Sequence, residues 1–377
     1  MDTLVVVVIV TALAFDFTNG FHDTANAMAT SIATRALSPR IAVGISAVLN
    51  LVGAFLSVEV AKTISNGLVD DSKVTPAVIF GGLVGAILWN LVTWLLGLPS
   101  SSSHALFGGL IGATWIAAGA DAVQFSNVVE KVIIPAIASP IIAGVVAATG
   151  TFLVYVITRR AAQRNVRSGF RHGQVISASL VSLAHGANDA QKTMGVITLV
   201  LITAGVLSSD SGPPIWVIFT SGLAIALGTY LGGWRIIRTV GHRLTKIEPQ
   251  QGFAAETSAA TVILASSHLG YPLSTTQVTS GAVIGAGVGK KLSEVKWGIA
   301  GRMAIAWLLT LPSAAVVGAL AGRIAISGTL GVLLVALALV VLATGFYLLS
   351  RRDKVDRHNV NDDDIKPSTS PRPTFAN

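Results

Sequence analysis

Two acidic side chains stand inside long apolar runs, each within a short motif that the chain contains twice. The first copy covers Gly20–Asn26 and holds Asp23, and the second covers Gly186–Lys192 and holds Asp189. An ionisable side chain in an apolar environment is costly, so a functional role is the default interpretation. A carboxylate there can bind a cation or carry a proton, and we expect both aspartates to do one of these.

A second motif, rich in hydroxyl groups, is also present twice. Pro99 is followed by Ser101, Ser102 and Ser103, and Pro272 is followed by Ser274, Thr275 and Thr276. A run of this kind after proline predicts a helix start, where free backbone N–H groups and hydroxyl groups together suit a tetrahedral oxyanion. Ordinary helix capping is the alternative interpretation. The glycines four residues apart behind each run, Gly108 with Gly112 and Gly281 with Gly285, indicate close helix packing.

Both motifs occur in the same order in each half of the chain, which indicates an internal duplication. We therefore expect the four segments to form one site built from two halves.

The composition is that of a membrane protein. Of the 377 residues, 52% are hydrophobic and 12% are charged, and the mean hydropathy is +0.70. Apolar runs of about 20 residues recur, so we expect an all-α polytopic membrane protein. The absence of cysteine excludes disulfides and thiolate metal sites. The first apolar run lacks a basic start and a cleavage site, which predicts a retained helix.

The net charge is +8, and most Lys and Arg residues lie in short loops or the C-terminal tail. Membrane topology explains this pattern, because cytoplasmic loops are rich in positive charge, so nucleic-acid binding is not expected. This distribution places the N-terminus outside and the C-terminus in the cytoplasm. Residues 3–34 are interrupted by polar groups and predict a broken or steeply tilted helix. Some short pairs, such as 76–97 with 102–118, fit re-entrant hairpins, and about 11–12 membrane elements are expected in all. The first half crosses an odd number of times, so the two halves form inverted repeats.

The expected organisation has five parts. They are a first repeat at 1–158, a basic cytoplasmic linker at 159–173, a second repeat at 174–322, a last transmembrane helix at 323–350 and a disordered cytoplasmic tail at 351–377.

Other polar residues give less specific signals. The amide oxygens of Asn26 and Asn188 suit a cation beside the aspartates. Lys192 stands where the first copy has Asn26, so its ammonium can contact the anion, replace a bound ion, or form a purely structural pair with Asp189. Candidate relay groups for protons or substrate are His22, His104, His185 and Gln277, and Glu256 is a candidate proton carrier. Asp16, Asn50 and Asn90 are expected to pack helices together first and to bind a ligand second.

These motifs resemble the paired signatures of the Pit-type inorganic phosphate transporter family, over roughly residues 3–350. The resemblance implies symport of phosphate driven by Na⁺ or H⁺. The motif variants in this chain are most similar to those of the bacterial low-affinity branch, which implies proton coupling and transport of metal–phosphate complexes. A homodimer is compatible with the resemblance. Gln277 departs from the histidine common in the family. Sulfate is an alternative substrate, since some relatives carry it.

An enzyme is not expected, since the chain lacks a zinc-binding His-Glu-x-x-His, a Gly-x-Ser-x-Gly elbow and a P-loop. No cofactor or resident metal is expected beyond the coupling cation. A passive anion channel is a further alternative, which the paired acids argue against.

Overall fold

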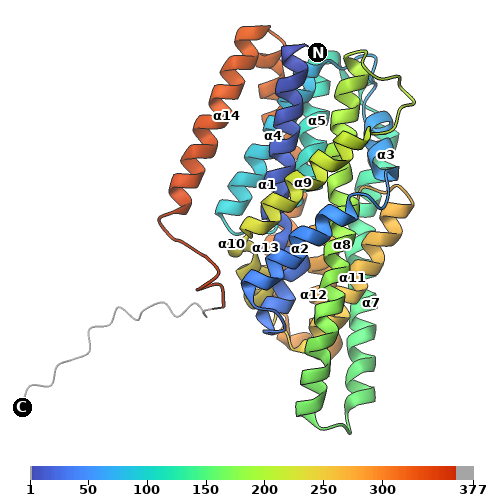
Figure 1. Cartoon of the computed structure of the whole chain (residues 1–377), viewed down its shortest axis with the longest axis vertical. Helices are drawn as coiled ribbons and strands as arrows, with labels where there is room; N and C mark the ends of the chain where they lie inside the picture. Colours follow the sequence, from blue (N-terminus) through green and yellow to red (C-terminus); the bar gives the residue numbers. More distant parts are fainter. Residues whose placement is uncertain (1, 362–377) are drawn as a thin grey trace, which may run out of the picture.

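The computed structural model describes residues 2–361, and over this range the chain is a bundle of α-helices (Figure 1). The expected all-α membrane class is confirmed. The helices are α1 Thr3–Ala33, α2 Pro39–Gly53, α3 Glu59–Gly67, α4 Pro76–Leu95, α5 Ser102–Ala118, α6 Phe125–Val128, α7 Ile134–Thr158, α8 Gln163–Thr203, α9 Ile215–Leu231, α10 Trp234–Arg238, α11 Pro249–His268, α12 Thr275–Lys290, α13 Trp297–Ala325 and α14 Thr329–Ser350. Short π-helical turns at Val129–Ile133 and Thr239–Arg243 and 3₁₀ turns at Ala120–Ala122 and Leu292–Glu294 connect some of them.

Five helical segments are long and apolar enough to cross a membrane. They are α1, α4, α6 with α7, α13 and α14. A sixth candidate is α9 with the segment Trp234–Arg243, which bend by 61° at their junction. By contrast, α5 has 17 residues and α12 has 16. At about 1.5 Å per residue both are shorter than a hydrocarbon core of about 30 Å. These lengths suit the re-entrant elements expected from the sequence.

Of the two alternatives expected for the first helix, a break or a steep tilt, the break is absent. α1 runs unbroken for 31 residues. It contains no proline, and most of its polar side chains are buried against other helices, so they do not disrupt its backbone. At about 1.5 Å per residue such a helix exceeds the bilayer core, so a tilt is required to fit it. The expected linker at 159–173 is largely helical as well, because α8 starts at Gln163 and continues for 41 residues.

Glycines bring the two halves of the chain into backbone contact. A Cβ on Gly108 or Gly112 of α5 would meet the backbone of Leu311 or Ala315 in α13. Gly281 of α12 meets Pro140 of α7 in the same way, so each half covers the short helix of the other. Gly20 of α1 packs on Gly228 of α9, and Gly186 of α8 packs on Gly53 of α2. This matched exchange of helices is compatible with the expected inverted duplication.

The described part of the expected tail, residues 351–361, makes specific contacts. The Arg235 guanidinium donates to the carbonyls of Ser350 and Asp353, and Arg238 donates to the carbonyl of Asn359. These donors hold the segment against α10 and the turn after it. The remaining part of the expected disordered tail, 362–377, lies outside the described residues.

Candidate functional site

Each Pro-Ser/Thr motif leads into a helix. Ser101 is the N-cap of α5 and accepts a hydrogen bond from the backbone N–H of His104 at 3.1 Å. Ser274 is the N-cap of α12 and accepts from the backbone N–H of Gln277 at 3.3 Å. Capping therefore accounts for the first hydroxyl of each run. The first-turn N–H groups that follow have no acceptor within their own helix, and the positive end of the helix dipole lies there.

Asp23 is contacted by the hydroxyl motifs of both halves. Ser102 donates to its Oδ2 at 2.6 Å, and Thr276 donates to its Oδ1 at 3.3 Å. His22 Nδ1 lies 2.6 Å from the same Oδ1. The carboxylate is 1% exposed, so it is removed from solvent and held by these polar partners.

Asp189 has a matching environment with one added charge. Thr275 donates to its Oδ2 at 3.0 Å, as Ser102 does to Asp23. His185 Nε2 lies 3.0 Å from Oδ2, and the Lys192 ammonium forms an ion pair with Oδ1. Both side chains of that ion pair are fully buried. The pairing of Lys192 with Asp189, one of the three alternatives that the sequence left open for this ammonium, is present.

The outer partners of the two motifs also correspond. His22 Nε2 lies 3.2 Å from the hydroxyl of Thr93 on α4, and Asn188 donates to the hydroxyl of Ser267 on α11 at 2.8 Å. Sequence reasoning missed Thr93 and Ser267, because a single hydroxyl in an apolar helix belongs to no motif. The available signal was their position a few residues before the two Pro-Ser/Thr motifs.

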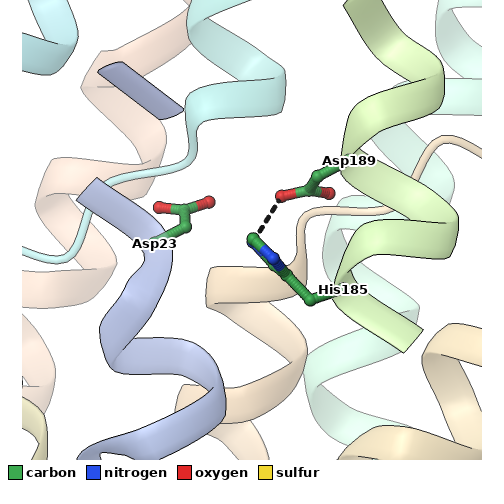
Figure 2. Close-up of side chains that lie close together, drawn as sticks. All are labelled: Asp23, His185 and Asp189. Carbon is green, nitrogen blue, oxygen red and sulfur yellow. Dashed lines mark ion pairs between the residues drawn. The ribbon is translucent and has the colours of Figure 1, made fainter. Parts of the chain in front are cut away.

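The two aspartates meet at one place. Ligand atoms of Asp23, His185 and Asp189 all lie within 4.8 Å of one another, and all three residues are buried. Figure 2 shows Asp23 reaching from α1 toward Asp189 and His185 on α8. The expectation that both halves contribute to one polar centre is met by this geometry. Two carboxylates this close repel each other when both are ionised, and the Lys192 ammonium offsets part of that repulsion at Asp189.

Further contacts cross between the halves. The Asn26 amide donates to the hydroxyls of Thr275 and Thr276 at 3.3 and 3.0 Å. Ser103 donates to the carbonyl of Leu273 at 3.0 Å. The side chain nitrogen of Asn188 is engaged, whereas its Oδ1 has no hydrogen-bond partner among the described residues. Asn188 therefore keeps an oxygen available for a cation.

The remaining candidates lie at different distances from the centre. The buried side chains of His104 and Gln277 follow the two caps, and neither hydrogen-bonds to an aspartate in the described part of the chain. Asn50 joins His185 at 3.1 Å to Thr229 at 2.8 Å, which links α2, α8 and α9. The side-chain amide of Asn90 has no hydrogen-bond partner among residues 2–361.

Glu256 on α11 forms a separate polar cluster. Its carboxylate accepts from Thr30 and Ser31 of α1 at 2.6 Å each, and from two residues of α8, Gln174 at 3.2 Å and Ser177 at 2.5 Å. These bonds satisfy a buried carboxylate and join three helices. A structural role is therefore established by contacts, and a role as proton carrier stays a prediction.

Comparison with known proteins places these motifs in a family. Residues 19–318 match the model of the phosphate transporter family. A probable low-affinity inorganic phosphate transporter of Mycobacterium bovis is 59% identical over 363 residues, which cover 96% of this chain and 87% of that protein. The Bacillus subtilis protein of the same description is 44% identical and covers 84% of this chain and 96% of its own length.

A solved structure described as the sodium-dependent phosphate transporter has a similar fold. Its TM-score is 0.69 at 25% identity, and the match covers 84% of this chain and 98% of that one. Relatives in this family are named as transporters, which agrees with the absence of enzyme motifs.

Proposed function

The chain belongs to the phosphate transporter family, and from that premise we propose that it is a secondary active symporter of inorganic phosphate. It is a multi-pass membrane transporter with phosphate as its substrate. The proposal adds that uptake is driven by a cation, H⁺ or Na⁺, across the cytoplasmic membrane. It places the N-terminus outside and the C-terminus in the cytoplasm, in keeping with the distribution of Lys and Arg.

One observation carries the proposal. Two hydroxyl-capped helix starts, one from each half, converge on a single pair of buried aspartates. Helix starts suit an oxyanion, whereas carboxylates suit a cation. A site that combines both kinds of group binds the anion and its coupling cation together.

The hydrogen bonds indicate how the two ligands depend on each other. Ser102 donates to Asp23 and Thr275 donates to Asp189. A cation or proton on the aspartates weakens the hydrogen bonds that these hydroxyls donate to the carboxylates, and the hydroxyls can then donate to phosphate instead. Phosphate in turn supplies negative charge that stabilises the bound cation. Each ligand therefore raises the affinity of the other, as linkage requires.

In this proposal Ser101 to Ser103, Ser274 to Thr276 and Lys192 hold phosphate. Asp23, Asn26, Asn188 and Asp189 bind or exchange the coupling cation, with His22, His104 and Gln277 as relay groups. Lys192 occupies the place of Asn26 and already neutralises Asp189. This asymmetry favours H⁺ over two Na⁺. The cluster of Asp23, His185 and Asp189 also suits a divalent ion carried as a complex with phosphate.

Transport by purified protein in proteoliposomes tests the proposal. We expect labelled phosphate to accumulate against its gradient when a pH gradient is imposed. Asp23→Asn and Asp189→Asn should abolish accumulation, whereas Asp121→Asn, which removes an exposed carboxylate, should not. Movement of phosphate only down its gradient would indicate a passive channel and refute symport. A strict need for Na⁺ would end the preference for H⁺.

Competition defines the substrate. Arsenate should compete with phosphate, and sulfate should compete weakly if phosphate is the carried anion. Adding Mg²⁺ distinguishes transport of free phosphate from transport of a metal–phosphate complex. If the complex is carried, uptake rises with the concentrations of both Mg²⁺ and phosphate. Sulfate uptake at the rate of phosphate uptake would contradict the assignment of phosphate as the preferred anion.

A further inference from the structure

Asp16 is a buried acid that the duplicated motifs do not include. It lies on α1, seven residues before Asp23, and its side chain is fully buried. At about 1.5 Å per residue this places it roughly 10 Å from Asp23, toward the start of α1. Neither carboxylate oxygen has a hydrogen-bond partner among the described residues.

The groups around Asp16 are polar and uncharged. Asn19 on the same helix and Thr193 on α8 face the carboxylate, and their side-chain polar atoms also lack hydrogen-bond partners within residues 2–361. All three side chains are 0% exposed. Together they offer two carboxylate oxygens, one amide oxygen and one hydroxyl oxygen at the contact of α1 with α8.

The charged groups near Asp16 come from α8. They are Asp189, which repels a negative charge on Asp16, and Lys192, which attracts it but already forms an ion pair with Asp189. Two other helices that pack extensively on α1 add no charge: α4 has no titratable side chain, and the one such residue in α9 is Tyr230, near its C-terminal end. No described cation is therefore committed to Asp16.

An ionised carboxylate without a cationic partner is strongly disfavoured in such a buried place. A bound proton removes that cost and gives Asp16 a donor for Asn19 or Thr193. Sodium is the weaker fit, because the described groups supply fewer oxygens than a hard cation usually takes. We propose that Asp16, together with Asn19 and Thr193, is a second proton-binding site, on the N-terminal side of the central aspartate pair.

This inference rests on the proposed function, in which the N-terminus of α1 faces outside. A proton from the outer solution then binds an oxygen of Asp16 before or with phosphate, and the same proton is released on the inner side at the end of the cycle. Neutral Asp16 removes the repulsion of Asp189 from across the α1–α8 contact. The site thereby couples the outer pH to the charge of the centre.

The test uses the full-length protein in proteoliposomes with three readouts. These are phosphate accumulation under an inward pH gradient, phosphate–phosphate exchange without a gradient, and proton entry measured with a trapped pH dye. Asp16→Asn has the shape of the neutral acid but cannot exchange a proton. Asp121→Asn is the matched control, because it removes a carboxylate from an exposed position.

Asp16→Asn should keep exchange and lose the stimulation by the pH gradient, an effect of roughly tenfold, within the usual range of coupling between two ligands. Phosphate-linked proton entry should fall with it, and Asp16→Glu should restore both. Accumulation and proton entry that persist in Asp16→Asn would overturn the proposal. Loss of stimulation by a Na⁺ gradient alone would also overturn it, in favour of a sodium site.

Thr193→Val provides an independent test that keeps the acid. Removing the hydroxyl that faces Asp16 disfavours its ionised form, so half-maximal uptake should shift to a higher outer pH. An unchanged pH profile in a variant that still transports would overturn the proposal. If the wild-type protein shows no cation-driven accumulation, the proposed function fails. If it does, and Asp16→Asn behaves the same, only this inference fails.

Discussion

Replacing Lys192 by asparagine gives the second half of the site the residue that the first half has at the matching position, Asn26. The variant therefore asks whether the ammonium does the work of a coupling cation. If it does, Lys192→Asn should turn a carrier that needs no Na⁺ at this position into one that needs an added cation. A purely structural ion pair predicts loss of stability and no new ion dependence.

The size of the effect follows from burial. Lys192 and Asp189 are each 0% exposed, and the ammonium contacts Asp189 Oδ1 directly. Removing one partner of a buried pair costs about 3–5 kcal/mol, because the other charge is left uncompensated. With tenfold for each 1.4 kcal/mol, the fraction of protein with an intact site should fall roughly 100-fold or more without Na⁺, and uptake should fall with it. His185, at 3.0 Å from the other oxygen, can offset part of this loss only when it is protonated.

The assay is phosphate uptake into proteoliposomes at an alkaline pH, with and without Na⁺. Lys192→Asn should be nearly inactive without Na⁺ and recover at least partly with it, and thermal stability in detergent should show the same dependence on Na⁺. Lys62→Asn is the control, because Lys62 pairs with Glu59 at the surface. Uptake by Lys192→Asn that equals wild type without Na⁺ would refute the reasoning, as would a loss that no monovalent cation reverses in a folded variant.

Three further predictions concern stability. Glu256→Ala should lower the free energy of unfolding by about 3 kcal/mol or more, and the melting temperature with it, since it removes an acceptor of four hydrogen bonds. Glu130→Ala, at an exposed position, should change neither. Arg35 follows the end of α1 with φ 58°, and Gly205 follows the end of α8 with φ 69°. Because glycine adopts positive φ without the steric cost that other residues have, Arg35→Gly should raise the free energy of unfolding by about 1 kcal/mol. Gly205→Arg should lower it by a similar amount, as measured by chemical or thermal unfolding. Burial raises the pKa of Glu248, but the Tyr155 hydroxyl and the Lys290 ammonium outweigh it and hold that pKa below its ordinary value of 4.5. The stability from Glu248 is therefore present above pH 4.5 and lost as pH falls below it, so wild type should lose more melting temperature than Glu248→Gln on acidification.

Much of the site could be predicted because its residues are grouped along the chain. Asp23 with Asn26, and Ser102 with its neighbours, fall in motifs that stand out from apolar surroundings and recur in the same order. Repetition identifies pairs of equivalent residues, and the contacts of Ser102 and Thr275 confirm that equivalence in space. Composition alone was enough for the helical membrane class.

Long-range contacts were beyond the sequence. Thr93 and Ser267 bind His22 and Asn188 from helices with no motif, so their role depends on packing that periodicity does not encode. The sequence also left open whether α1 is broken or steeply tilted. The helix is unbroken, and polar residues that were interpreted as interruptions find partners on other helices, as Asn26 does in the hydroxyls of Thr275 and Thr276.

The asymmetry of the two halves is more informative than their likeness. An exact duplication would place two identical carboxylate sites face to face and would bind two equal cations. Here the second half carries its own ammonium at Lys192, which leaves Asp23 as the central carboxylate without a fixed lysine partner in the described chain. Asp16 then adds an acid on the first half only. The exchangeable cation should therefore be bound mainly by α1, with α8 supplying a permanent charge. Neutralising Asp23 should accordingly abolish coupling at every pH, whereas replacing the ammonium beside Asp189, as in Lys192→Asn, should alter which cation is used.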